Sequence, residues 1–401
     1  MPVPDADRLL GLVDDDFVAG LAAELIAIPG HEDLDRREAG VALFLDELLR
    51  AEGLAVELAE VEPGRPNVIA RLAGTAPGPC LMLNAHIDTV PGYGMPDAYT
   101  PRWRDGRLWG RGAADMKGAL ACMAGALRAL RRSGRPLAGE VVLAGVVGEE
   151  SGSHGTLHLV DAGGRADFAI VGEPTRLRIA RAHKGGMWAE ARFEGRAAHG
   201  SVPEQGINAI QHAARFVTAV ETRLRPQLDG RTHPLLGRAT VNTGVIRGGD
   251  RPPTVPSWCS VQLDRRWLPG EDHAGVLEEL RNLLRELEAD LLELRWTVEE
   301  MPGTATFVHW WLDTPEDVAG MPELRAAVEH VQGRAAELTG VQFWTDAALL
   351  AHQGATPAVV CGPGDIAQAH GDEEWVEREQ LELATRVYLL AAAAFLTPAA
   401  T

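Results

Sequence analysis

The stretch that decides the fold is LMLNAHIDTVPG, residues 81–92. It begins as a short apolar run, which predicts a buried strand. Two reactive side chains, His86 and Asp88, follow this run. Three other apolar runs end in the same way. VVLAGVVGEESG leads to Glu149 and Glu150, FAIVGEPT leads to Glu173, and PAVVCGPGDIAQAH leads to His370.

Helical patterns alternate with these strands. Apolar residues recur at helical spacing over 14–28, 33–51 and 116–132, before and between the strand-like runs. This alternation is typical of an α/β sheet with helices on its faces. In such a sheet, ligands bind outside the carboxyl ends of the strands, so we expect the reactive side chains to converge there.

The pattern changes near residue 180. From there to residue 298, the expected order of elements is β-α-β-β-α-β, the split βαβ or ferredoxin-like arrangement. The first pattern then returns, with a helix expected over 322–339. The sequence therefore predicts an α+β domain, 181–298, inserted between two parts of an α/β domain, 1–180 and 299–401.

The composition is that of a globular enzyme and excludes several partners. Of 401 residues, 46% are hydrophobic and 24% are charged, ordinary values for a soluble protein. The net charge, 38 − 57 = −19, repels nucleic acid and anionic membrane surfaces, so we expect neither. The amino-terminal segment lacks a signal-peptide pattern, and the apolar run 387–396 is too short to span a bilayer. We expect a cytoplasmic protein.

The residue types expected at the carboxyl ends of the strands are those of a metal site. Two imidazoles with three or four carboxylates suit one or two divalent ions of the zinc type. The four cysteines are scattered without a CxxC pair and do not form a zinc site. Asp115, in GRGAADMKG, begins the helix after the first strand and joins the set.

The two adjacent glutamates suggest a division of roles. Because they are adjacent in the chain, the carboxylates of Glu149 and Glu150 repel each other unless a bound cation gives them different roles. One can bind the metal while the other takes a proton from water and passes it to a leaving amine. Asp88, two residues after His86, is placed to hold that imidazole in one tautomer.

Each of these residues also has an ordinary structural explanation. A Glu–Glu pair is usually a solvated surface feature, and Asp115 could cap a helix. The joint occurrence of these residues at strand ends favours the metal site. In the inserted domain, spacing alone gives His199 no role, and Arg266 is either a clamp for a substrate carboxylate or part of a surface ion pair.

Six motifs, in order, give the chain an end-to-end resemblance to a known family. They are HIDTVP, GRGAADMKG, GEESG, VGEPT, AAHGSVPEQGINAI and GPGDIAQAH. They resemble the dinuclear-zinc amidohydrolases and metallopeptidases, which include acetylornithine deacetylase, succinyl-diaminopimelate desuccinylase, aminoacylase and glutamate carboxypeptidase. The last motif is most similar to that of acetylornithine deacetylases. The resemblance implies a zinc-exopeptidase-like catalytic domain, with a mixed sheet flanked by helices, and an inserted ferredoxin-like lid and dimerisation domain.

The resemblance also implies a role for each motif residue. It implies two divalent ions per subunit, zinc first and cobalt as the alternative. Glu149 would be the general base and acid, and the peptide between Asp115 and Met116 would be cis. The implied ligands are Asp115 bridging both ions, His86 and Glu173 on one ion, and Glu150 and His370 on the other.

Three residues of the inserted domain are implied to meet the substrate. In a homodimer, His199 would reach the partner subunit's active site and stabilise the oxyanion, while Arg266 would contact the substrate carboxylate. Asn242 is a further candidate for substrate contact. The sequence departs from the family pattern in GGDRPPTVPS, where Pro253 stands in place of an asparagine and Ser257 in place of an acid.

The implied reaction is hydrolysis of the amide bond of an N-acyl amino acid by metal-activated water. The first candidate substrate is acetylornithine or a similar small molecule. A carboxypeptidase or dipeptidase of the same family is the alternative, and a non-catalytic metal-binding protein is the alternative of another class. Glu149, which a purely structural metal site does not need, favours catalysis.

Overall fold

The computed structural model describes residues 5–398 except 290 and 292, and the chain forms two compact units. The first unit consists of the residues up to 181, residues 314–340 and the residues from 345 onward. The second unit consists of residues 182–313 and 341–344. The second unit is therefore formed almost entirely by one continuous segment between two parts of the first.

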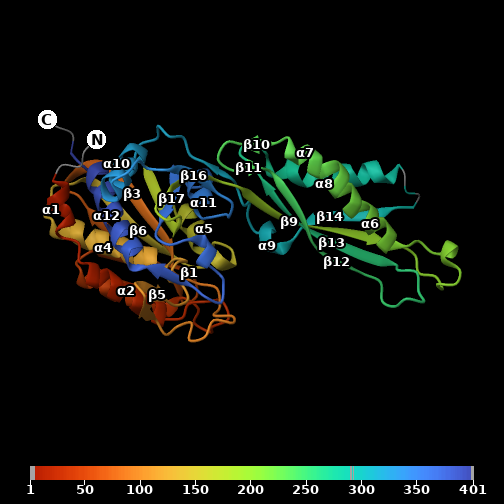
Figure 1. Ribbon diagram of the computed structural model, residues 1–401, viewed down its shortest axis with the longest axis horizontal. Coiled ribbons are helices and arrows are strands. Elements are labelled where there is room, and N and C mark those ends of the chain that lie inside the picture. The colour runs from red at the N-terminus through yellow and green to blue at the C-terminus, as the bar shows by residue number, and fades with distance from the viewer. Residues whose placement is uncertain (1–4, 290, 292, 399–401) are drawn as a thin grey trace. The chain divides into compact units, whose positions relative to one another are not determined.

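A mixed β-sheet forms the centre of the first unit (Figure 1). Its middle strands run parallel, β6 with β3, β3 with β7 and β7 with β17, while β1, β2 and β8 pair antiparallel at its sides. The predicted mixed sheet flanked by helices is thus confirmed. In spatial order, seven of its nine strands are β1 (Ala55–Glu62), β2 (Arg65–Ala73), β6 (Ala138–Val146), β3 (Ala76–His86), β7 (Phe168–Pro174), β17 (Ala358–Gly362) and β8 (Ile179–His183).

Both faces of this sheet are covered, which explains its uninterrupted apolar strands. On β3, Leu81 and Leu83 belong to the main core cluster, while Met82 between them is equally buried on the opposite face. α5 (His154–Asp161) and α11 (Ala347–His352) contact each other and lie against strands of the sheet. The helices that contribute to the main cluster are α1 (Ala6–Leu10), α2 (Asp15–Ala27), α3 (Ala39–Ala51), α4 (Lys117–Arg132), α10 (Met321–Gln332) and α12 (Arg378–Phe395).

The most apolar run of the chain forms part of this core. α12 contacts both α4 and α10 (Figure 1). Its Tyr388, Leu389 and Leu390 are fully buried. The Tyr388 hydroxyl donates a hydrogen bond to the Cys361 carbonyl at 2.8 Å, which joins α12 to β17. Among the described residues, no helix is long and apolar enough to cross a membrane.

The second unit contains its own antiparallel sheet, in the order β12-β13-β9-β14. Chain order β9-α6-β12-β13-α8-β14 together with this sheet order is the split βαβ arrangement expected from the sequence. Phe193 on β9 packs against Phe216 on α6, within a separate hydrophobic core. The elements are β9 (Gly185–Glu194), α6 (Ala209–Ala219), β12 (Thr240–Gly248), β13 (Trp258–Trp267), α8 (His273–Glu288) and β14 (Arg295–Glu300).

Candidate metal centre

The predicted reactive residues follow the carboxyl ends of the parallel strands of the first unit. β3 ends at His86, and β7 ends one residue beyond Glu173. After β6 the chain turns at Gly148, where φ is +72°, into the 3-10 helix η1 (Glu149–Ser151). β17 leads through a loop to His370. Because these strands are parallel neighbours, the residues that follow them meet at one edge of the sheet.

Asp115 lies between the two imidazoles. Its Oδ1 is 3.0 Å from Nε2 of His86, and its Oδ2 is 3.2 Å from Nε2 of His370. The peptide bond from Asp115 to Met116 is cis, as the resemblance implies. The two oxygens of one carboxylate thus point toward different imidazoles, the arrangement that a ligand shared by two ions requires.

Two glutamates lie on opposite sides of Asp115. Oε1 of Glu173 is 3.5 Å from Nε2 of His86, and Oε1 of Glu150 is 3.0 Å from Nε2 of His370. Potential ligand atoms of His86, Glu149 and Glu173 lie within 4.8 Å of one another, as do those of His86, Asp115 and Glu150. The structure therefore brings all five proposed ligands and Glu149 into one cluster.

The carboxylates of this cluster outnumber its positive charges. Burial raises the pKa of Glu149 and Glu173 well above the ordinary value, and neighbouring carboxylates raise it further. Burial also raises the pKa of Glu150. For Asp115, hydrogen bonds to the two imidazoles outweigh burial, so its pKa lies below the ordinary value. Buried carboxylates without enough cations are unfavourable, and divalent ions would supply the missing charge.

The neighbouring carboxylates also favour the protonated, positively charged form of the two imidazoles. Burial alone would lower the pKa of His86, but hydrogen bonds to Asp115 and Asp88 raise it well above 6.5. Hydrogen bonds to Asp115 and Glu150 raise the pKa of His370 to about 10. A set of two imidazoles and several oxygen ligands that attracts cations in this way fits two divalent ions.

Asp88 positions two of the segments that form the centre. Its Oδ1 is 3.4 Å from Nδ1 of His86, and its backbone carbonyl is 3.1 Å from the same nitrogen. The Asp88 carboxylate also accepts the backbone N–H groups of Glu149 at 3.2 Å and Glu150 at 3.0 Å. It therefore fixes the turn after β6 as well as the His86 ring.

Sequence reasoning missed three buried charged residues beside the centre. Glu374 accepts hydrogen bonds from the loop that carries Asp115 and forms an ion pair with Arg111. The Lys117 ammonium donates to the carbonyls of Leu25 and Ile28, at 2.9 and 2.6 Å, where α2 ends. Arg111 and Lys117 stand in the motif GRGAADMKG, which could have drawn attention to them, whereas the segment HGDEEWVE around Glu374 offers no such signal.

The other three candidates lie in the second unit. His199 is exposed, and its Nδ1 is 2.7 Å from the Ser201 hydroxyl. Arg266 lies near the end of β13, where its Nε is 2.9 Å from Oδ1 of Asp264. Asn242 is exposed on β12. Arg266 therefore forms the ion pair that was the alternative to a substrate contact, with part of its side chain still accessible.

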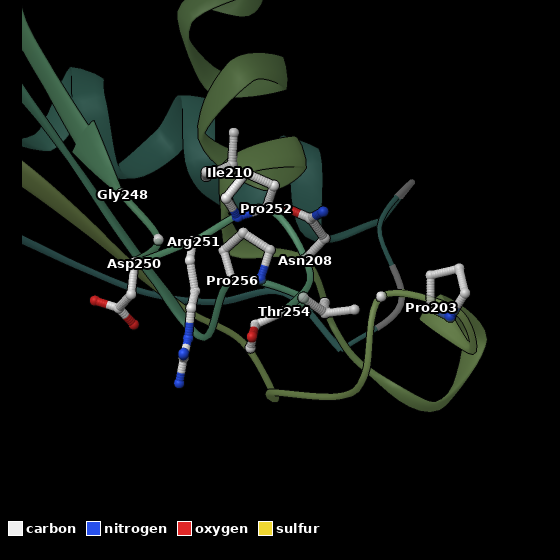
Figure 2. Close-up of a pocket in the computed structure, with 12 residues that line it drawn as sticks. Pro203, Asn208, Ile210, Gly248, Asp250, Arg251, Pro252, Thr254 and Pro256 are labelled. Atoms are coloured by element: carbon white, nitrogen blue, oxygen red, sulfur yellow. The ribbon is translucent and has the colours of Figure 1, made fainter.

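The segment that departs from the family pattern lines a cavity of about 510 Å³ in the second unit (Figure 2). His199 pairs through its backbone with Thr254 of this segment. Asn208 accepts the N–H of Gln211 at 3.1 Å and so caps α6 at the cavity. The departing segment therefore lies beside the backbone of His199. The lining residues are Gly200, Pro203, Asn208, Ile210, 248–252 and 254–256.

Comparison with known proteins places this architecture among metallopeptidases. Residues 82–394 match the model of peptidase family M20/M25/M40. An acetylornithine deacetylase of Proteus mirabilis (strain HI4320) is 32% identical over 383 residues, covering 90% of this chain and 92% of that protein. An acetylornithine deacetylase of Myxococcus xanthus is 35% identical over 358 residues, covering 86% and 90%. A dinuclear metal-binding M20 peptidase of Bacillus subtilis superposes with a TM-score of 0.73 at 16% identity, covering 95% and 98%.

Proposed function

The chain belongs to peptidase family M20/M25/M40, and we propose that it is a deacylase that hydrolyses the amide bond of an N-acyl amino acid. N-acetylornithine is the first candidate substrate, because two relatives that are similar over most of the chain are named acetylornithine deacetylases. Members of this family are hydrolases, which argues against a non-catalytic metal-binding protein.

The observation that carries the proposal is the position of Glu149. Ligand-type atoms of Glu149 lie beside those of His86 and Glu173. Asp88 fixes the Glu149 backbone through a hydrogen bond to its N–H. Within the described part of the chain, no hydrogen bond engages the carboxylate of Glu149. A carboxylate held at the centre in this way is available to exchange protons.

The proposed reaction uses the cluster as follows. Two divalent ions, when bound, would supply polarisation of the amide carbonyl and activation of a water molecule for attack. His86, Asp115, Glu150, Glu173 and His370 would hold them, and we propose zinc, with cobalt as the alternative. Glu149 accepts the proton of the attacking water as the new C–O bond forms. It then gives that proton to the nitrogen as the C–N bond breaks, releasing a carboxylic acid and an amino acid.

The choice of substrate can be tested with a panel. Purified protein loaded with zinc or cobalt is incubated with N-acetylornithine, an N-succinyl amino acid and a dipeptide, and amine release is measured. We expect the N-acetyl substrate to have the highest kcat/KM, and we expect a chelator to abolish its cleavage.

The outcomes of this panel separate the alternatives. Adding the metal back after chelation must restore cleavage, because the ligands themselves are unchanged. A dipeptide cleaved at least about 10-fold more efficiently than the acyl substrates would favour the peptidase alternative. No cleavage by protein that carries its metal would refute the deacylase proposal.

We propose that the second unit is a lid and dimerisation domain. Since Nδ1 of His199 bonds Ser201, Nε2 is the ring nitrogen that can donate to the developing oxyanion, in the active site of the partner subunit. Arg266 would hold the substrate carboxylate bidentately, and Asn242 would contact the substrate. The cytoplasmic location and the exclusion of nucleic-acid and membrane partners remain predictions from the sequence.

Mixing two defective variants tests the role of His199. We expect His199→Ala to lower kcat by about 10² to 10³-fold, the usual effect of removing an oxyanion donor. Mixed with Glu149→Gln and allowed to exchange subunits, it should recover about a quarter of wild-type activity, since half the dimers are then mixed and each has one intact site. A monomer in sedimentation, or no recovery on mixing, would contradict action across a dimer.

A further inference from the structure

A buried carboxylate organises the loop that carries Asp115. Glu374 is completely buried. Its Oε1 accepts three backbone N–H groups, from Gly112 at 3.0 Å, Ala114 at 3.0 Å and Asp115 at 3.1 Å. Three donors of one short loop thus converge on a single oxygen, which fixes the path of the backbone up to Asp115 itself.

The partner of Glu374 connects this loop to two other segments. Nη1 of Arg111 is 2.6 Å from Oε2 of Glu374. Nη2 of Arg111 donates to the carbonyl of Gly371 at 2.9 Å, and its Nε donates to the carbonyl of Pro91 at 3.1 Å. Gly371 follows His370 directly, and Pro91 lies five residues beyond His86. One buried ion pair is therefore bonded to the three segments that carry His86, Asp115 and His370.

Net stabilisation is a poor explanation for this pair. Removing a guanidinium and a carboxylate from water is costly, and well-packed apolar residues often replace such pairs without loss of stability. The pair does, however, form directional hydrogen bonds to three backbone segments at once. Groups that orient metal ligands in this way commonly change metal affinity by about 10- to 100-fold when they are mutated.

We propose that the Arg111–Glu374 pair is a positioning device for the two metal sites. It holds the backbone of Asp115 at a fixed place between the His86 segment and the His370 segment, so that the two carboxylate oxygens face different imidazoles. The inference rests on the metal centre of the proposed function and is independent of which substrate is cleaved.

Metal titration of a conservative variant tests the proposal. Glu374→Gln retains an oxygen for the loop N–H groups but loses the charge that pairs with Arg111. We expect the affinity for the more weakly bound ion to fall by about 10- to 100-fold, with a larger fall for Glu374→Ala. Competition with a chromophoric chelator measures affinity, and the visible absorption of the cobalt-loaded protein reports the ligand geometry, which should change.

The matched control breaks an ion pair elsewhere in the first unit. Asp15 on α2 binds Arg386 on α12 at 2.9 and 2.8 Å, and neither residue hydrogen-bonds a ligand-bearing segment in the described structure. We expect Asp15→Asn to keep metal affinity within about twofold of the wild type. Urea unfolding establishes that each variant is folded.

Either result is decisive. If folded Glu374→Gln retains wild-type metal affinity and the wild-type cobalt spectrum, the pair serves only stability and the proposal fails, whatever happens to Glu374→Ala. If the wild type binds two ions but cleaves no acyl substrate, the proposed function fails while the positioning role can still be measured.

Discussion

Glu149→Gln is expected to lower kcat by about 10³-fold, within the range found for general acid–base residues, while both metal ions stay bound. The amide has nearly the same shape as the carboxylate but cannot accept the proton of the attacking water. KM should change little, because the carboxylate is proposed to act on the reacting atoms and not on the bound substrate. The kcat is measured at saturating substrate, and the metal content by elemental analysis.

The same measurement separates two roles for Glu149. Its ligand-type atoms group with those of His86 and Glu173, so a ligand role is the alternative to a base. Loss of one ion from Glu149→Gln would favour that alternative, and retention of more than about a tenth of the activity would exclude the base. Glu24→Gln, the same substitution at an exposed position of α2, should leave both properties unchanged.

Asp115→Ala is expected to remove both ions. Its two oxygens face different imidazoles at 3.0 and 3.2 Å, so its loss removes a ligand from each ion and the negative charge between them. We expect affinity for each ion to fall by more than about 10²-fold, beyond the usual effect of an orienting partner. Activity should fall below detection at ordinary metal concentrations.

Glu173→Ala is the comparison that makes this result specific. Glu173 lies on the His86 side alone, so its loss should weaken one ion and leave the other near wild-type affinity. Binding of two ions by Asp115→Ala would show that Asp115 is not the shared ligand. Equal effects of the two substitutions on both ions would contradict the assignment of separate sides.

The convergence of the reactive residues could be predicted because it follows from a local pattern. Each buried strand is recognisable in the sequence as an apolar run, and a reactive side chain stands at or just beyond its end, as in LMLNAH. Parallel strands necessarily place those ends at one edge. The pattern was weaker for β1, where AVELAEVE mixes charges with small apolar residues, because no residue of this strand is fully buried.

Other features depend on contacts that no local pattern records. Arg111 and Glu374 are 263 positions apart, and nothing in either segment identifies the other. The helix expected over 322–339 ends at Gln332, which is a correction. Gly333 adopts a left-handed conformation with φ +66° and ends the helix, and β16 (Leu338–Val341) follows. An apolar periodicity that continues past a glycine was the misleading signal.

The place of β17 in the sheet has a consequence for how the protein is made. β17 lies between β7 and β8, although nearly the whole second unit separates it from them in the chain. During synthesis, the edge of β7 that pairs with β17 stays unpaired until residues 358–362 have left the ribosome. An unpaired strand edge favours association with other chains. His370 arrives later still. The metal centre is therefore among the last parts of the first unit that can be completed, and newly made chains should depend most on chaperones in this interval.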